Sequence, residues 1–254
     1  MGERTLLDDA RSRRALDELH HKDVNFDVRG RGEFTRENGW HIDDLCRRLP
    51  PEAPGPPQPG GSWEVARDLV HNYEFADPSI IRAIYYPDRP LEQRDMLLEG
   101  RFFGLRFLFG CRVGGVIDGL RTIDGRQVQV WGWNYRTLQD HLEMGQMDYE
   151  VWKWLDSGQV EFRIHAFSKA AHISNPIVRL GFWLFGRAMQ VRFARRACAR
   201  MAQLTSAGLA QRSASGASET VPRASRNVIV APTDVDPKIK RRSARRLGDD
   251  DSTG

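Results

Sequence analysis

A change in hydrophobic period close to residue 175 limits the folds that this chain can adopt. Between Val160 and Phe167, apolar residues recur at every second position, which is typical of a half-buried β-strand. After this run, Ser174 or Asn175 suits a helix cap, and Pro176 suits the first helical position. The sequence therefore predicts a strand that leads into a helix.

The predicted helix, from Asn175 to Leu204, is long and amphipathic. At ~1.5 Å per residue it spans roughly 45 Å, which is enough to cross a whole sheet. Its apolar residues recur at helical spacing: Ile177, Leu180, Leu184, Ala188, Val191, Cys198 and Met201. We assign its arginines to the outer side: Arg179, Arg187, Arg192, Arg195, Arg196 and Arg200.

Two more strands precede Val160. The segments from Val128 to Tyr135 and from Tyr149 to Leu155 are rich in aromatic and β-branched residues. Asp124-Gly125 and Asp156-Ser157-Gly158 are hairpin signals, because Gly adopts positive φ without a steric penalty. These strands and the following helix predict a curved antiparallel sheet wrapped around the helix, with an apolar space between them.

The upstream region predicts further elements of the same domain. Trp63 to Glu74 favours a strand, and Asp77 to Tyr85 favours a short helix with Asp77 as its cap. Met96 to Phe109 and Arg112 to Arg121 favour two more strands. The predicted fold class is α+β: a curved antiparallel sheet that grips a long C-terminal helix, followed by a disordered tail.

Composition divides the chain into four parts. Residues 1–24 form a charged N-terminal arm, and residues 25–61 an extension that ends in a Pro-rich linker. Residues 62–204 form the predicted helix-grip-like domain. Residues 205–254 are rich in Ser, Ala, Gly and Arg, and we predict a disordered basic tail because this composition buries too little apolar surface to fold.

The same composition limits location and partners. Cys46, Cys111 and Cys198 are far apart in the sequence, which favours a reduced, cytoplasmic setting. No secretory signal follows Met1, and the apolar run Leu180 to Gly186 is much shorter than the ~20 residues of a membrane span. A net charge of +4 is too small to argue for nucleic acid.

Motifs that identify common cofactor sites are absent from the sequence. It contains no GxGxxG or P-loop spacing, no GxSxG elbow, no HExxH and no Cys/His cluster. We therefore predict no cofactor and no metal site. No catalytic motif is recognised, so enzymatic activity stays an open question.

One pair of residues is a candidate for chemistry. His141 and Glu143 are two positions apart beside Asp140, and they are able to act in acid–base catalysis or anchor a ligand if they line a cavity. The alternative is a turn whose polar side chains cap backbone groups. The candidate ligand-binding residues are aromatic, and core packing is the alternative for them: Trp131, Trp133, Tyr135, Phe162, Phe182 and Phe185.

The segment around His141 resembles the domain-of-unknown-function family numbered nineteen-ninety. The residues that match its motif are Tyr135, Thr137, Leu138, His141, Glu143 and Gly145. Ala166-Phe167-Ser168 matches a later turn of the family, whereas Arg136 and Gln146 depart from its pattern. The resemblance extends from Trp63 to about Met201 and implies no known activity. The order of elements also resembles the helix-grip fold of START-type lipid-binding proteins and polyketide cyclases.

Three functional hypotheses follow. The leading one is a protein that binds a small hydrophobic ligand between the sheet and the C-terminal helix. The second is a cyclase- or hydrolase-like enzyme that uses His141 in the same pocket. The third is an interaction protein that contacts an anionic membrane or nucleic acid through its basic helix and the run from Lys238 to Arg246.

Overall fold

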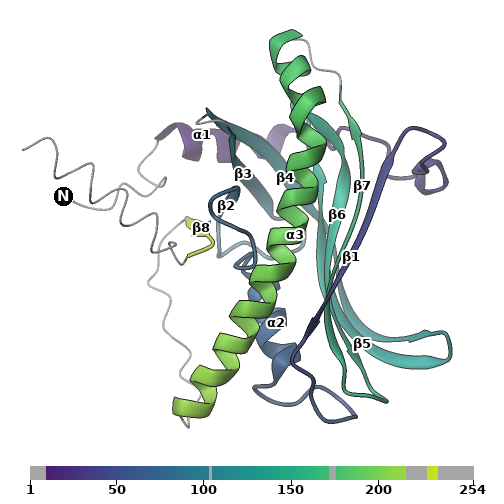
Figure 1. Cartoon of the computed structure of the whole chain (residues 1–254). Helices are drawn as coiled ribbons and strands as arrows, with labels where there is room; N and C mark the ends of the chain where they lie inside the picture. The colour runs from purple at the N-terminus through teal and green to yellow at the C-terminus, as the bar shows by residue number, and fades with distance from the viewer. Residues whose placement is uncertain (1–9, 103–104, 172–175, 216–227, 234–254) are drawn as a thin grey trace, which may run out of the picture.

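The computed structural model describes residues 10–102, 105–171, 176–215 and 228–233 (Figure 1). These residues form an eight-stranded sheet in the order β1-β7-β6-β5-β4-β3-β2-β8. The strands are β1 (His41–Leu49), β2 (Ile81–Tyr85), β3 (Asp95–Phe102), β4 (Leu105–Ile123), β5 (Arg126–Thr137), β6 (Glu143–Trp154), β7 (Val160–Ala170) and β8 (Ile229–Ala231). The helices are α1 (Ala10–Glu18), α2 (Ser62–His71) and α3 (Pro176–Ser215), with short 3-10 turns η2 (Leu19–His21) and η3 (Arg31–Glu33).

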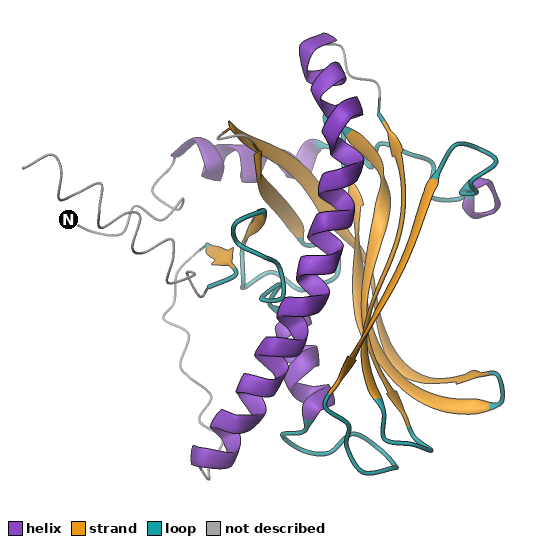
Figure 2. Cartoon of the chain, in the orientation of Figure 1, coloured by secondary structure: helices purple, strands orange, loops and turns teal. Residues whose placement is uncertain are grey.

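The sheet is a curved meander from β3 to β7. Every neighbouring pair of strands in it is antiparallel. Asp124, Gly125 and Gly158 all have positive φ at the predicted hairpin turns, with values of 50°, 75° and 70°. Figure 2 shows the sheet bending around the long helix α3. The predicted fold class, an antiparallel sheet that grips a C-terminal helix, is therefore confirmed.

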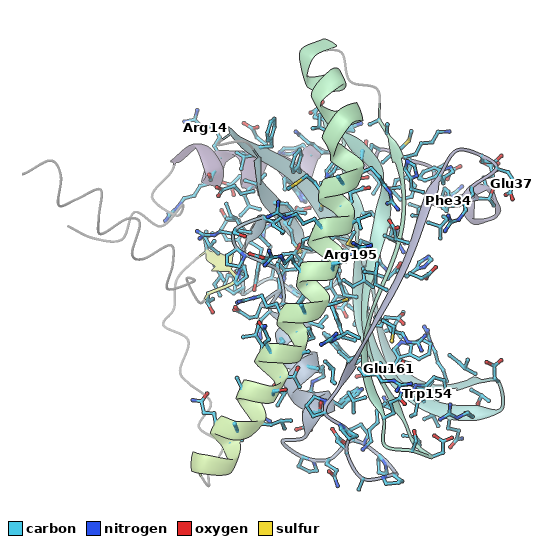
Figure 3. All side chains as sticks on the ribbon, in the orientation of Figure 1. Arg14, Phe34, Glu37, Trp154, Glu161 and Arg195 are labelled. Atoms are coloured by element: carbon cyan, nitrogen blue, oxygen red, sulfur yellow. The ribbon has the colours of Figure 1, made fainter. Side chains whose placement is uncertain are left out.

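Helix α3 lies across the concave side of the sheet and packs on β1, β7 and α2. Its buried side chains share one stripe: Phe193, Ala194, Ala197, Cys198, Met201 and Thr205. Arg192, Arg195 and Arg196 are exposed on the other side, and Figure 3 labels Arg195. The amphipathic pattern thus sets which side of α3 faces the sheet.

Helix α2 replaces a strand that the sequence predicted, so the assignment of Trp63 to Glu74 as a strand is wrong. Trp63, Ala66 and Val70 are buried, and their spacing matches one face of a helix. This face packs between α3 and strands β5, β6 and β7. The aromatic and β-branched residues of this segment favoured a strand. The structure forms a helix because the three apolar residues then lie on one face, which packs against the concave side of the sheet.

The predicted helix from Asp77 to Tyr85 is also wrong, because this segment is a turn followed by β2. The Asp77 carboxylate accepts hydrogen bonds from the Ser79 backbone N–H at 2.9 Å and from its hydroxyl at 2.6 Å. Asp bonding to a backbone group two residues later closes a turn instead of capping a helix. The chain then pairs with β3 from Ile81 onward.

Both ends of the chain contribute to the sheet and its outer face. β1 comes from the predicted extension and pairs with β7 along the sheet edge. In α1 and η2, Leu16 and Leu19 pack with Ile84 and Leu97, which face away from the main core. Helix α3 continues through Ser215, and β8 pairs with β2, although both segments fall in the predicted disordered tail.

The Pro-rich segment is docked on the domain. Lys153 on β6 is fully buried and pairs with Glu52 at 2.5 Å. The same carboxylate accepts the backbone N–H of Gln58 at 2.9 Å and that of Trp63 at 2.7 Å. Glu52 therefore ties this segment to both β6 and the start of α2.

Within the described residues, no helix is both long and apolar enough to cross a membrane. The run from Lys238 to Arg246 lies outside them, so contact with nucleic acid or anionic lipid through this run stays a prediction.

Candidate functional site

A cavity of about 40 Å³ lies between α3 and the strands β5, β6 and β7. One wall carries residues of the sequence motif: Tyr135, Thr137, His141, Glu143 and Gly145. The opposite wall includes Gln190 and Ala194 of α3, and Met147, Ile164 and Ala166 add apolar surface. Since one water needs roughly 10–15 Å³ of such space, the cavity holds about three non-hydrogen atoms.

The turn between β5 and β6 is fixed by hydrogen bonds to Thr137 and Asn25. The Thr137 hydroxyl accepts the Gly145 backbone N–H at 2.9 Å and donates to Asn25 Oδ1 at 2.6 Å. The Asn25 side-chain amide donates to the Glu143 carbonyl at 2.8 Å. The N-terminal segment thus locks the turn that carries His141 and Glu143.

Gly145 is required by its backbone and its surroundings. Its φ is 157°, and a Cβ at this position would collide with the Phe167 carbonyl oxygen of β7. Any other residue is therefore strained here. Ala166, Phe167 and Ser168, which the family resemblance describes as a turn, lie within β7. Phe167 stacks on Phe34 with ring centroids 4.4 Å apart, and Figure 3 labels Phe34.

His141 is held as a neutral imidazole. The Glu143 backbone N–H donates to His141 Nδ1 at 3.0 Å, so the ring proton resides on Nε2. Burial lowers the pKa of His141 to about 4. The Phe109 ring lies 5.0 Å from the imidazole, between centroids. At neutral pH the ring is therefore uncharged, and its Nε2–H is a hydrogen-bond donor.

Glu143 connects the sheet to α3. Both of its carboxyl oxygens accept the Gln190 side-chain amide, at 2.5 Å each. Burial raises the pKa of Glu143 to about 7, while the Gln190 hydrogen bond and the nearby Arg187 oppose this increase. The carboxyl group is therefore about half protonated near neutral pH.

A second connection to α3 involves Arg187 and Asp43. The Arg187 guanidinium hydrogen-bonds both carboxylate oxygens of Asp43 on β1, and this bond lowers the pKa of Asp43. The assignment of Arg187 to the outer side of the helix is wrong, since it is half-buried against the sheet edge. Gln190 also donates to the Ser168 hydroxyl at 3.2 Å.

Sequence reasoning missed three residues of this polar network, Asn25, Asp43 and Gln190, and it noted Ser168 only as part of a match to the family. One signal was present for Gln190, which precedes Ala194 and Ala197 at helical spacing on the buried stripe. A polar residue on such a stripe needs a buried partner. The partners themselves come from β1, β7 and the N-terminal segment, and no local pattern brings these together.

Two tyrosine hydroxyls meet at Met147, where Tyr135 lines the cavity and Tyr149 lies in the core next to it. Tyr149 donates to the Met147 sulfur at 3.0 Å, and the Tyr135 hydroxyl lies 3.8 Å from the same sulfur. Burial raises the pKa of both Tyr135 and Tyr149 well above the ordinary value. Both therefore stay as neutral O–H donors across the physiological range.

The structure separates the predicted ligand-binding aromatics. Tyr135 lines the cavity, but Trp131, Trp133 and Phe162 do not, because they pack in the main core beside α2. The Trp133 indole N–H donates to the Val70 carbonyl of α2 at 3.0 Å. Phe182 and Phe185 belong to the part of α3 whose side chains are outside the described residues.

No group of three or more His, Cys, Asp or Glu side chains is placed to bind a metal ion in the described part of the chain. Cys46 is exposed, whereas Cys111 and Cys198 are buried, and all are free.

Solved structures with similar folds share little sequence with this chain. The Zhui aromatase/cyclase from Streptomyces sp. R1128 is 14% identical, over 69% of this chain and 98% of its own, with a TM-score of 0.39. Human STARD10 is 12% identical, over 76% and 84%, with a TM-score of 0.37. A START superfamily protein from Mycobacterium smegmatis is 13% identical, over 65% and 99%, with a TM-score of 0.35. None of the curated proteins matches the chain.

The family model described as "Domain of unknown function (DUF1990)" matches residues 28–200. This range begins ahead of Trp63, so it includes β1 and the Pro-rich segment as well as the β5–β6 turn and most of the sheet. The family resemblance carried by the motif around His141 is thus confirmed. This chain belongs to the DUF1990 family, a domain family of unknown function.

Proposed function

We propose that this protein binds a small hydrophobic molecule through a polar end that enters the cavity between the sheet and α3. The observation that carries the proposal is the lining of this cavity. Hydrogen-bonding groups of Tyr135, His141 and Glu143 meet there with the apolar side chains of Met147 and Ile164. A few convergent polar groups in an apolar setting are typical of small-molecule sites.

The size of the cavity limits how such a ligand binds. About 40 Å³ accommodates a head group of about three non-hydrogen atoms. A longer apolar body requires side chains along the seam between α3 and the sheet to move. The polar bonds of Gln190 and Arg187 span this seam, and they are able to break and re-form without exposing a large apolar surface.

A cavity-filling substitution tests the proposal. Ala194 lines the cavity and is 4% exposed, whereas Ala199 is exposed on the other side of α3. Native mass spectrometry of the purified full-length chain should reveal a co-purifying small molecule that Ala194→Phe loses and Ala199→Phe keeps. Equal occupancy in the two variants, or a bare mass for the unmodified chain, contradicts the proposal.

A cyclase- or hydrolase-like enzyme is the second candidate, and it is favoured by one observation. His141 and Glu143 line the same cavity, and burial moves their pKa values in opposite directions, to about 4 and about 7. Groups whose environments push their pKa values apart are typical of acid–base pairs. The lone pair of His141 Nδ1 already accepts a hydrogen bond, so His141 does not act as the base. In this candidate, the Glu143 carboxyl group transfers the proton, and the neutral His141 ring donates a hydrogen bond to the substrate from Nε2.

Hydrolysis of p-nitrophenyl butyrate as a function of pH tests the enzymatic candidate. The rate should follow a group with an apparent pKa near 7, and Glu143→Gln should abolish this dependence. Hydrolysis no faster than in buffer, or a pH profile that Glu143→Gln leaves unchanged, contradicts a hydrolase of this type.

A further inference from the structure

We infer that the polar end recognised in this cavity is an uncharged carbonyl oxygen, such as that of a ketone or an ester. This inference rests on the proposed ligand binding and specifies its chemistry. It follows from three features of the described lining: donors whose acceptors are weak or missing, acceptors that each already accept a hydrogen bond, and a neighbouring cation that is already paired with a carboxylate.

His141 supplies the first donor. Its Nδ1 accepts the Glu143 backbone N–H at 3.0 Å, which places the ring proton on Nε2. Within the part of the chain that the structure describes, no hydrogen bond satisfies this Nε2–H. His141 is partly exposed, so solvent reaches this donor when no ligand covers it. A ligand that covers it without accepting its proton would leave an unpaired donor at a free-energy cost, which a carbonyl oxygen avoids.

Tyr135 supplies the second donor. The acceptor beside its hydroxyl is the Met147 thioether sulfur at 3.8 Å, which is a weak acceptor, and the hydroxyl also hydrogen-bonds with that of Tyr149. A carbonyl oxygen is a better acceptor than the sulfur. The Thr137 hydroxyl also lines the cavity, but its proton is given to Asn25 Oδ1 at 2.6 Å. The donors available to a ligand are therefore His141 and Tyr135, together with the Ser168 O–H, since that hydroxyl accepts Gln190 and still carries its own proton.

The acceptors that line the cavity are already engaged, which disfavours a ligand that must donate. Both Glu143 oxygens accept the Gln190 amide, and both Asp43 oxygens accept Arg187. The Ser168 hydroxyl accepts Gln190 at 3.2 Å. An alcohol that binds here has to share one of these acceptors to satisfy its own proton, whereas a carbonyl oxygen has no proton to place.

Charge disfavours a carboxylate head group. Among the side chains that the structure describes, Arg187 lies beside the cavity as a cation, and its guanidinium is paired with Asp43. Glu143 adds a further acidic group to the same lining. A ligand carboxylate would thus be desolvated next to an acid and without a free counter-ion, which is costly. The uncharged carbonyl avoids this cost.

Three probes with the same skeleton test the head group: 2-heptanone, 2-heptanol and heptanoate. Each is titrated into the full-length chain at pH 8 and followed by protein-observed NMR. We expect the ketone to bind about tenfold more tightly than either of the others, because one unmade hydrogen bond is worth up to about tenfold in affinity. The resonances of Thr137, Gly145 and Ala194 report whether binding occurs at the cavity.

Matched variants locate the donors. Tyr135→Phe removes one O–H, and Tyr86→Phe removes an O–H that donates to Asp17 elsewhere on the molecule. His141→Asn keeps an acceptor for the Glu143 N–H but removes the Nε2–H, whereas His141→Gln keeps a donor at the Nε2 position. Tyr135→Phe and His141→Asn should each weaken ketone binding about two- to tenfold, with little change for Tyr86→Phe and partial rescue by His141→Gln.

The outcomes separate the two proposals. Equal binding of ketone and alcohol, unchanged by Tyr135→Phe and His141→Asn, overturns the carbonyl inference and leaves ligand binding standing. Tighter binding of heptanoate overturns it as well. If none of the three probes shifts the cavity resonances, ligand binding at this cavity is wrong, and the carbonyl inference falls with it.

Discussion

Gln190 on α3 and Glu143 on β6 form a bridge in which one side-chain amide contacts both carboxyl oxygens at 2.5 Å each. Burial raises the pKa of Glu143 to about 7, so the bridge includes a group that titrates near neutral pH. The position of the long helix over the cavity is therefore linked to the protonation of one residue.

Glu143 should make the protein less stable as the pH rises. Its folded-state pKa of about 7 lies above the ordinary value of 4.5, so the folded state retains the proton that the unfolded chain releases. Its contribution should thus fall between pH 4.5 and 7 by about 2–3 kcal/mol. Urea denaturation at several pH values should show that Glu143→Gln removes this decline. Glu92→Gln is the control, because Glu92 is exposed, and an equal effect of both variants would contradict the assignment.

His141 should make the protein more stable as the pH rises, which is the opposite of the effect of Glu143. Burial lowers its pKa from 6.5 to about 4, so the unfolded chain takes up a proton that the folded state does not. The contribution of the neutral His141 ring to the free energy of unfolding is complete above pH 6.5, and it is lost as the pH falls toward 4. Imidazole ¹⁵N NMR should show a neutral ring protonated at Nε2 down to about pH 5. Titration of His141 near pH 6.5 would show that the ring is hydrated instead.

The buried pair of Lys153 and Glu52 should be costly to break. Neither side chain is more than 3% exposed. Lys153→Met leaves a buried carboxylate without its counter-ion, which should cost about 3–5 kcal/mol of unfolding free energy. The double variant Lys153→Met with Glu52→Leu should lose less unfolding free energy than the sum of the losses of the two single variants. Lys22→Met, which breaks an exposed pair with Asp140, should cost less than about 1 kcal/mol. Chemical denaturation measures all four, and additive losses would refute the coupling.

Gly145 should not tolerate a side chain. Gly145→Ala adds a Cβ where the backbone has positive φ and the Phe167 carbonyl leaves no room, so we expect a loss of about 3 kcal/mol or more. Gly119→Ala is the matched control, because no atom lies within 4 Å of its added Cβ. Thermal unfolding compares the two variants. Similar melting temperatures for both would mean that β7 shifts to accept the methyl group.

The strands around the site follow closely from local pattern. Alternation from Val160 to Phe167 predicted β7, and the glycines of the two hairpin turns predicted where β5 begins and where β6 ends. Local pattern failed at Trp63 to Glu74, where aromatic and β-branched residues favoured a strand. The segment is a helix because helical spacing places Trp63, Ala66 and Val70 on one face, and this face is buried against the concave side of the sheet.

In the candidate site too, some residues were recognisable from the sequence and others only from their tertiary contacts. His141 and Glu143 were recognisable because they are near one another in the sequence and belong to a family motif. Trp131, Trp133 and Phe162 were candidate ligand-binding residues with core packing as the alternative, and all three lie in the main core. Asp43 and Gln190 are separated from the motif by long stretches of chain, and only their contacts with Arg187 and Glu143 identify them.

The sequence by itself determined the antiparallel strands, their turns and the long amphipathic helix, because these depend on side-chain periodicity and on the backbone freedom of glycine. Only the tertiary structure decided what fills the space between sheet and helix. Helix α2 fills part of that space, and a cavity of about 40 Å³ lies between α3 and the strands β5, β6 and β7. It also decided the charge states of His141 and Glu143, because desolvation depends on which segments pack around a group and not on its neighbours in the sequence.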